Sequence, residues 1–193
     1  PEQAVNWDYI ISKISQRTKK NQEVKVLNLF AYTGGATVAA LSAGASVCHV
    51  DSSQGMVNWA KENVSSSGLR ERPVRFLVDD VVKFVNREIR RNNKYDMIIM
   101  DPPYGRGKNG EVWSIEKDIN NLLCLCSKIL SDNPISVIIN TYTGGLSGTI
   151  IENVAKLAFS ENNPKKIFHN EIGLRQKNSE FVLPCGITTI CEF

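Results

Sequence analysis

The chain has 193 residues, of which 42% are hydrophobic and 22% charged, and this is enough for one globular domain with a substantial core. It contains no run of about 18 apolar residues and no signal-peptide pattern, so we expect neither a membrane span nor a leader. The net charge of +3 is mildly basic, less than a dedicated nucleic-acid binding domain usually has.

The first periodic segment, residues 4–17, predicts an amphipathic helix that places Trp7, Ile10 and Ile14 on one face. After a polar break at 18–23, apolar strands and amphipathic helices alternate along the chain. We predict strands from Val24 and at 46–50, 74–78, 95–100 and 135–140, and helices at 36–43, 53–64, 81–91, 115–130 and 146–159. Two further strands, 166–174 and 181–191, follow with no helix between them.

This alternation predicts an α/β fold with a mostly parallel, doubly wound sheet of seven strands. The last two strands should form an antiparallel hairpin at one edge. In such sheets ligands bind outside the carboxyl ends of the strands. Glycines or oxygen acceptors fall at five of these ends: Thr33-Gly34, Asp51, Asp79-Asp80, Asp101 and Asn140-Thr141. We divide the chain into an N-terminal helical segment, 1–23, and a main domain, 24–193.

The stretch from Val24 to Gly35 is the centre of the predicted site. A nearly all-apolar strand ends in a turn containing Gly34 and Gly35, and the following helix would direct free N–H groups at a ligand. The three-glycine dinucleotide fingerprint and the P-loop lysine are both missing, so the turn is not a phosphate cradle. The alternative is a tight strand-to-helix turn that binds nothing.

Three acidic residues at strand ends suggest contacts to a nucleoside. Asp51 follows Gly34 at nearly the offset from which a carboxylate reaches a ribose diol. Its alternative role is to N-cap the helix from Ser53. Asp80, or Asp79, could accept a hydrogen bond from an adenine amino group, and helix capping is again the alternative.

The sequence Asp101-Pro102-Pro103-Tyr104 is a sharper signal. Two prolines stiffen the backbone and have no N–H donor, so they present carbonyls and the Asp101 carboxylate as a fixed set of acceptors. The aromatic ring that follows can stack on a flat ring. This combination suits an amine-bearing nucleobase, whereas the alternative is a strand ended by prolines and a turn tyrosine.

The cysteines argue against a metal centre. There are five of them, they form no Cys-x-x-Cys pair, and only two histidines could join them. We therefore expect no metal, and reduced thiols in a cytoplasmic protein. Because the chain begins at Pro1 instead of methionine, we also expect a preceding segment in the full-length protein.

Four segments together resemble the class I S-adenosylmethionine-dependent methyltransferases: Leu29-Phe-Ala-Tyr-Thr-Gly-Gly35, Asp51-Ser52, Asp79-Asp-Val81 and Asp101-Pro-Pro-Tyr104. More narrowly, the chain is similar to bacterial large-subunit ribosomal RNA methyltransferases of the I and K/L types, over nearly its whole length. The opening Pro1-Glu-Gln3 with Asn6-Trp7 adds to this likeness. The resemblance implies a Rossmann-like fold, S-adenosylmethionine as cofactor and a catalytic domain at 24–193.

The resemblance also implies roles for individual residues. The cofactor would be bound by Phe30, Ala31, Tyr32, Thr33, Gly34 and Gly35 around its methionine part, by Asp51 and Ser52 at the ribose, by Asp79, Asp80 and Val81 at the adenine, and by Gln3 from the N-terminal segment. The target pocket would be lined by Asp101, Pro102, Pro103 and Tyr104.

Members of this family that methylate carbon 5 of cytosine use a cysteine at the end of the fifth strand, and Tyr142 stands at that position here. A covalent thiolate mechanism is therefore disfavoured, and transfer to nitrogen is expected.

We expect the substrate to be a nucleobase in RNA, with ribosomal RNA as the first choice. The candidate phosphate contacts are Arg87, Arg90, Arg91, Arg106 and Lys108, although such clusters are often only solvated helix faces or loops. Three alternatives stay open: a small-molecule methyltransferase of the same fold, a nicotinamide-dependent dehydrogenase, and a non-catalytic RNA-binding module. The absent third glycine argues against the dehydrogenase, and the intact Asp101-Pro-Pro-Tyr104 sequence argues against the non-catalytic module.

Overall fold

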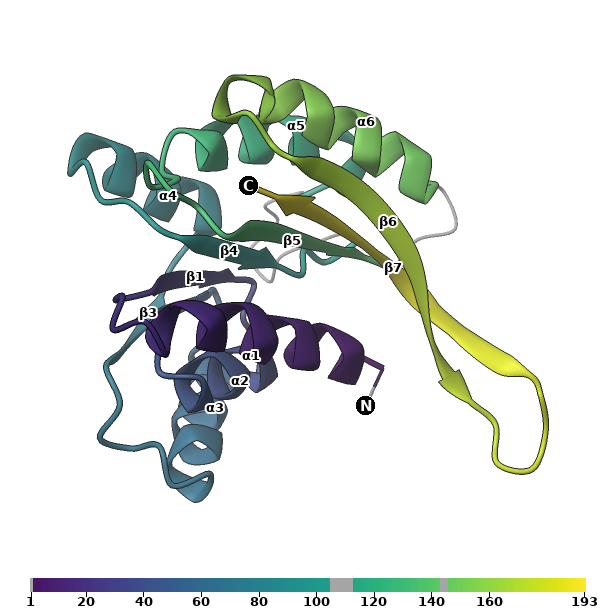
Figure 1. Ribbon diagram of the computed structural model, residues 1–193, viewed down its shortest axis with the longest axis horizontal. Helices are drawn as coiled ribbons and strands as arrows, with labels where there is room; N and C mark the ends of the chain where they lie inside the picture. The colour runs from purple at the N-terminus through teal and green to yellow at the C-terminus, as the bar shows by residue number, and fades with distance from the viewer. Residues whose placement is uncertain (1, 105–112, 143–145) are drawn as a thin grey trace.

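A seven-stranded sheet covered by helices on both faces forms the molecule (Figure 1). The computed structural model describes residues 2–104, 113–142 and 146–193. The strands are β1 (Lys25–Leu29), β2 (Ser46–Asp51), β3 (Val74–Val78), β4 (Met97–Met100), β5 (Ser136–Thr141), β6 (Lys166–Arg175) and β7 (Val182–Glu192). The helices are α1 (Ala4–Thr18), α2 (Gly35–Ser42), α3 (Gln54–Ser66), α4 (Val81–Arg90), α5 (Ile115–Ser127) and α6 (Gly148–Ala158).

The strand order is β3-β2-β1-β4-β5-β7-β6, in which β1 to β5 are parallel and β7 runs antiparallel to both of its neighbours. The predicted mostly parallel sheet with a C-terminal antiparallel hairpin is therefore confirmed. The structure also has the Rossmann-like arrangement that was expected.

Two apolar cores lie on opposite faces of the sheet. One contains side chains of α4, α5 and α6, and the other contains side chains of α1, α2 and α3. Figure 1 shows these two groups of helices on either side of the strands. Because both faces are covered, β4 and β5 are buried along their whole length, which accounts for their continuous apolar sequence.

The element boundaries differ from the predicted ones by a few residues, for local reasons. The strand expected from Tyr95 begins at Met97, because Tyr95 forms only an isolated bridge with Leu130, and the helix expected to reach Leu130 ends at Ser127. The helix expected from residue 146 begins at Gly148, because the Ser147 side chain accepts the capping hydrogen bond from Ile150 N.

Helix α1 is fastened to the sheet near both of its ends. Near its start, Asn6 Nδ2 donates to Asn140 Oδ1 at 3.1 Å and to Thr188 Oγ1 at 2.8 Å. Near its end, Arg17 donates to the carbonyls of Asn133 at 2.6 Å and of Pro134 at 3.1 Å. The division of the chain at residue 23 stays a prediction.

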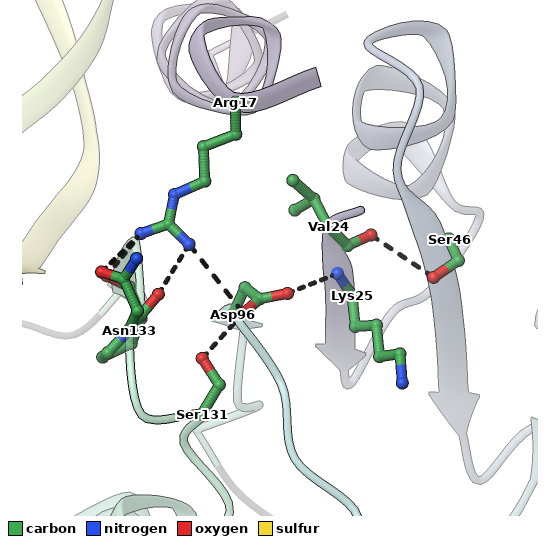
Figure 2. A network of polar contacts seen from close by, with 8 residues as sticks. Arg17, Val24, Lys25, Ser46, Asp96, Ser131 and Asn133 are labelled. Atoms are coloured by element: carbon green, nitrogen blue, oxygen red, sulfur yellow. Dashed lines mark hydrogen bonds and ion pairs between the residues drawn. The ribbon is translucent and has the colours of Figure 1, made fainter. Parts of the chain in front are cut away.

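The contacts at the end of α1 converge on Asp96 (Figure 2). Its Oδ1 lies 3.9 Å from Arg17 Nη1 and accepts a 2.7 Å hydrogen bond from Ser131 Oγ, while its Oδ2 accepts a 2.8 Å bond from Lys25 N. One carboxylate thus connects α1, the start of β1 and the loop after α5, all at the amino ends of the strands.

We expect Asp96→Ala to lower the free energy of unfolding by about 1–3 kcal/mol, because several partners lose their acceptor at once. Urea denaturation followed by circular dichroism measures this difference. The matched control is Asp132→Ala, since Asp132 is an exposed carboxylate near the same edge and its removal should change stability by less than about 0.5 kcal/mol. Equal midpoints for the two variants would contradict this account of Asp96.

Candidate active site

A cavity of about 750 Å³ opens at the carboxyl ends of β1, β4 and β5, and its size is typical of small-molecule sites. The β1–α2 loop lines it with residues 30–35, the end of β4 contributes Asp101, and the end of β5 contributes Asn140 and Tyr142. The start of α1 closes one side with Glu2, Gln3 and Trp7. The glycine loop and Asp101, which are far apart in sequence, therefore share one cavity.

The β1–α2 loop has a strained backbone. Phe30 and Tyr32 adopt positive φ angles of 53° and 48°, a conformation that costs a non-glycine residue about 1–2 kcal/mol. Hydrogen bonds fix the loop: Ala31 N donates to Val50 O, Gly34 N donates to Ala31 O, and Asn63 Nδ2 donates to Thr33 O. These bonds give the residues predicted to bind a cofactor one defined shape.

Both loop glycines are required by the packing of the protein itself. Gly34 has a φ of 84°, and a Cβ at this position would lie 3.0 Å from Ala60 Cβ. A Cβ on Gly35 would lie 2.7 Å from the Trp7 ring. The loop therefore fits closely between α3 and α1, and its predicted contact with a ligand stays a prediction.

Asp51 connects two loops beside the cavity. Its Oδ2 accepts a 2.9 Å bond from Tyr32 N, and its Oδ1 accepts a 2.8 Å bond from Ser53 N. The alternative in which Asp51 N-caps the next helix is wrong, because Ser53 occupies the N-cap position of α3. Asp51 instead holds the end of β2 against the strained loop.

The acidic pair after β3 makes contacts within its own segment. Asp80 is the N-cap of α4, and its Oδ1 accepts a 2.8 Å bond from Lys83 N. Asp79 pairs with Arg87, about two helical turns further on, and Val81 is buried. Among the described residues, those lining the cavity do not include Asp51, Ser52 or 79–81. The capping alternative for Asp80 is thus observed, and the adenine contact stays a prediction.

The Asp101 carboxyl is the most perturbed acid at the cavity. Its pKa is raised from the ordinary value of 3.8 to about 6. Burial is the largest cause, the hydrogen bond from Tyr142 lowers the pKa, and the nearby charge of Glu2 raises it. The Tyr142 hydroxyl donates to Asp101 Oδ2 at 3.2 Å. Pro102 is buried, whereas Pro103 is exposed and Tyr104 is 60% exposed. The motif thus presents a partly desolvated acceptor next to an accessible aromatic ring.

A network of polar side chains holds Tyr142, the hydrogen-bond donor to Asp101, in place. Gln3 Nε2 donates to the Tyr142 hydroxyl, and Asn6 Nδ2 donates to Gln3 Oε1 at 2.6 Å. Asn6 also reaches the Asn140–Thr188 pair, in which Thr188 Oγ1 donates to Asn140 Oδ1 at 2.9 Å. Among these residues the sequence singled out Gln3 as a cofactor contact, Asn6 as part of the resemblance, and Asn140 as the end of a strand. Tyr142 was noted only for standing where a cysteine would be expected.

Of the predicted RNA-contacting arginines, Arg87 and Arg90 lie on α4 and Arg91 is its C-cap residue, all outside the described lining of the cavity. Arg87 pairs with Asp79, and Arg91 Nη1 lies 3.4 Å from Glu88 Oε1. Because α4 begins at the carboxyl end of β3 and returns toward the start of β4, Arg90 and Arg91 lie toward the amino ends of the strands. Arg106 and Lys108 lie outside the described residues. A role in RNA binding for all five stays a prediction.

The described part of the chain contains no group of three or more His, Cys, Asp or Glu side chains able to hold a metal ion. All five cysteines are free thiols. None of the helices in the described ranges is long and apolar enough to cross a bilayer.

Comparison with protein families and curated sequences gives consistent matches. The family described as "Conserved hypothetical protein 95" matches residues 12–158. The Ribosomal RNA large subunit methyltransferase K/L of Shewanella baltica (strain OS195) is 38% identical over 116 residues, which is 58% of this chain and 16% of that protein. The protein of the same name from Shewanella frigidimarina is 39% identical over 111 residues, 56% of this chain and 15% of that protein. The chain thus spans about one sixth of the length of these curated relatives.

Solved structures agree with this grouping. The SAM-dependent methyltransferase from Agrobacterium tumefaciens has a TM-score of 0.92 and 33% identity, covering all of this chain and 62% of that one. SMU.776, solved as a complex with SAH, has a TM-score of 0.66 and 27% identity, covering 87% of this chain and 45% of that one. The magnesium protoporphyrin IX methyltransferase of Synechocystis PCC 6803, at 13% identity and a TM-score of 0.62, shares the fold.

We expect the Asp101 carboxyl to titrate with a midpoint near 6, because burial disfavours its charged form. Tyr142→Phe should raise the midpoint further, since the hydroxyl that stabilises the charged carboxylate is lost. Carbon-13 NMR of labelled aspartate, assigned with Asp101→Asn, measures both midpoints. Tyr104→Phe is the matched control and should leave the midpoint in place. A wild-type midpoint near 4 would contradict the buried environment.

Proposed function

The chain belongs to the Conserved hypothetical protein 95 family, and we propose that it is an S-adenosylmethionine-dependent methyltransferase acting on a nucleobase of RNA. The observation that carries the proposal is the shared cavity of the β1–α2 loop and Asp101. The names of the curated relatives support ribosomal RNA as the substrate, and the Agrobacterium and SMU.776 structures support the cofactor. We place the protein in the cytoplasm.

The residues around the cavity fit such a cofactor. Each Asp51 oxygen accepts one backbone N–H, and a carboxylate has about four acceptor sites, so roughly two remain for the hydroxyls of a ribose. Residues 30–35 would surround the methionine part, with Gln3 closing the site from α1. Asp80 and Val81 would contact the adenine. When bound, the cofactor supplies a methyl group already activated by a sulfonium.

The protein's own contribution is alignment and electrostatics. With a pKa of about 6, Asp101 is mostly ionised at pH 7, so both of its oxygens can accept hydrogen bonds. The Asp101 carboxylate and the Pro102 carbonyl would accept bonds from an amine on the target base, while Tyr104 stacks on the base. An oriented amine keeps its lone pair directed toward the methyl group, and such positioning can supply a large part of the rate.

We propose a nitrogen atom as the methyl acceptor. Tyr142 at the end of β5 donates to Asp101 and cannot form the covalent adduct that carbon-5 methylation of cytosine requires. None of the five cysteines is among the described residues lining the cavity. A target base in RNA would have to be unpaired or turned out of its stack to reach Asp101.

The decisive experiment is methyl transfer from labelled S-adenosylmethionine to undermethylated total RNA, with the labelled nucleoside mapped. Asp101→Ala should lower the transfer rate by at least about 100-fold, because a positioned electrostatic group is lost. The affinity of Asp101→Ala for S-adenosylhomocysteine, measured by calorimetry, should be nearly that of the wild-type protein. Asp132→Ala serves as the control and should transfer normally.

Two other outcomes would contradict the proposal. Transfer that survives in Asp101→Ala would remove Asp101 from its role as the acceptor group. Methylation of free metabolites by the wild-type protein, with none of RNA, would favour the small-molecule methyltransferase.

Asp51→Ala tests the cofactor site separately. We expect its affinity for S-adenosylhomocysteine to fall about tenfold or more, because a charged acceptor for the ribose is lost and the loop loses the bond to Tyr32. Asp51→Asn keeps one acceptor oxygen and should lose less. Calorimetry measures all three affinities, and an unchanged value for Asp51→Ala would rule out the ribose contact.

A further inference from the structure

The β6–β7 hairpin extends beyond the edge of the sheet at which the cavity opens. Pairing between β5 and β7 runs from Ser136–Glu192 to Thr141–Ile187 and stops there, while residues 182–186 of β7 pair with β6 alone. At about 3.3 Å per residue, the hairpin reaches on the order of 15 Å past the end of β5. Figure 1 shows it extending beyond the other strands, on the side where α1 begins.

The base of the hairpin is packed against the cavity wall. Gly186 has a φ of 134°, and a Cβ at this position would lie 2.6 Å from Thr141 O and 3.0 Å from the Tyr142 ring. On the other strand, a Cβ on Gly173 would lie 2.5 Å from Val182 Cγ1, next to a shift in register. Because the Tyr142 hydroxyl also donates a hydrogen bond to Asp101, the hairpin has a defined position relative to the Asp101 carboxylate.

The end of the hairpin, residues 174–184, is called the tip. Its loop is closed by backbone and side-chain bonds: Gln176 N donates to Phe181 O at 3.0 Å, and Phe181 N donates to Ser179 Oγ at 3.1 Å. Three consecutive apolar side chains at the tip are nonetheless exposed, with Phe181 at 77%, Val182 at 52% and Leu183 at 63%. Contiguous exposed apolar residues on an ordered element indicate a binding surface.

The charges of the tip indicate the kind of partner. Arg175 and Lys177 are both exposed and precede the exposed Phe181 in the tip, which contains a single carboxylate, Glu180. An aromatic ring beside cations is the combination that binds single-stranded nucleic acid, because bases stack on the ring and phosphates pair with the cations. A partner with an anionic backbone and flat apolar rings satisfies both features.

We propose that the tip binds the single-stranded RNA next to the target nucleotide, with Phe181 stacking on a base and Arg175 and Lys177 contacting phosphates. This inference rests on the proposed function and adds a second contact region for the same substrate. The tip lies beside the cavity but outside its described lining, so it acts on substrate binding and leaves the cofactor site unchanged.

Steady-state methylation of RNA tests the proposal with two variants, Phe181→Ala and the double variant R175A/K177A. Each should raise KM for RNA about tenfold, because a stacking or phosphate contact is lost, with kcat within about twofold of wild type. The double variant should also lower the dependence of KM on salt concentration. Affinity for S-adenosylhomocysteine, measured by calorimetry, should stay at the wild-type value and shows that the variants are folded.

Two matched controls define the effect. Leu157→Ala removes an exposed apolar side chain, 75% exposed, from the later part of α6, and Lys20→Ala removes an exposed cation just after α1. Both lie toward the amino ends of the strands, away from the cavity, and should leave KM for RNA unchanged.

The outcomes separate this inference from the proposed function. If the wild-type protein methylates RNA and the tip variants match the controls in KM, the inference is wrong while the proposed function stands. If the wild-type protein transfers no methyl group to RNA, the proposed function fails and the inference fails with it. If light scattering shows that Phe181→Ala converts a dimer to a monomer while KM is unchanged, the tip binds a second copy of the chain and the RNA assignment is wrong.

Discussion

The site depends on one electrostatic constraint: the Asp101 carboxylate is partly shielded from bulk water and still accepts hydrogen bonds. Burial alone would favour the neutral acid, and the bond from Tyr142 opposes this by stabilising the charge. Tyr142 is positioned by Gln3, and Gln3 by Asn6. The Tyr142 hydroxyl that lowers the pKa of Asp101 is therefore connected through Gln3 to Asn6 in the first turn of α1, and Asn6 joins this turn to β5 and β7.

The fold could be predicted because its signals are local in the sequence. Apolar runs and helical periods marked β3 and α4 almost to the residue, and turn residues marked the junctions between them. The order of the strands could not be predicted in this way, because the pairing of β5 with β7 joins segments about 50 residues apart through backbone groups that every residue has. The bridge between Tyr95 and Leu130 was missed for the same reason.

In the candidate site, too, the features that are local in the sequence could be predicted, whereas the long-range contacts could not. Residues 30–35 and Asp101 stand in compact motifs, and the capping bond of Asp80 to Lys83, three residues away, was foreseen as an alternative. The bond from Tyr32 to Asp51 and the network of Asn6 with Asn140 and Thr188 are long-range, and single-sequence patterns contain no signal for them. The glycines show a further difference. From the sequence, Gly35 was explained by the backbone freedom of glycine. In the structure a glycine is required there because a Cβ would lie too close to the Trp7 ring.

The topology also explains why a recognition element would be built from β6 and β7. Each parallel strand must turn into a helix at the carboxyl edge, because a strand that continued alone would leave its backbone N–H and C=O groups unpaired. An antiparallel pair can continue past that edge, since the two strands satisfy each other's hydrogen bonds, and β6 and β7 here stay paired as far as Arg175 and Val182. The hairpin is therefore the part of this sheet that can reach a substrate larger than the cavity, and its glycines at 173 and 186 let it do so while Tyr142 stays packed against its base.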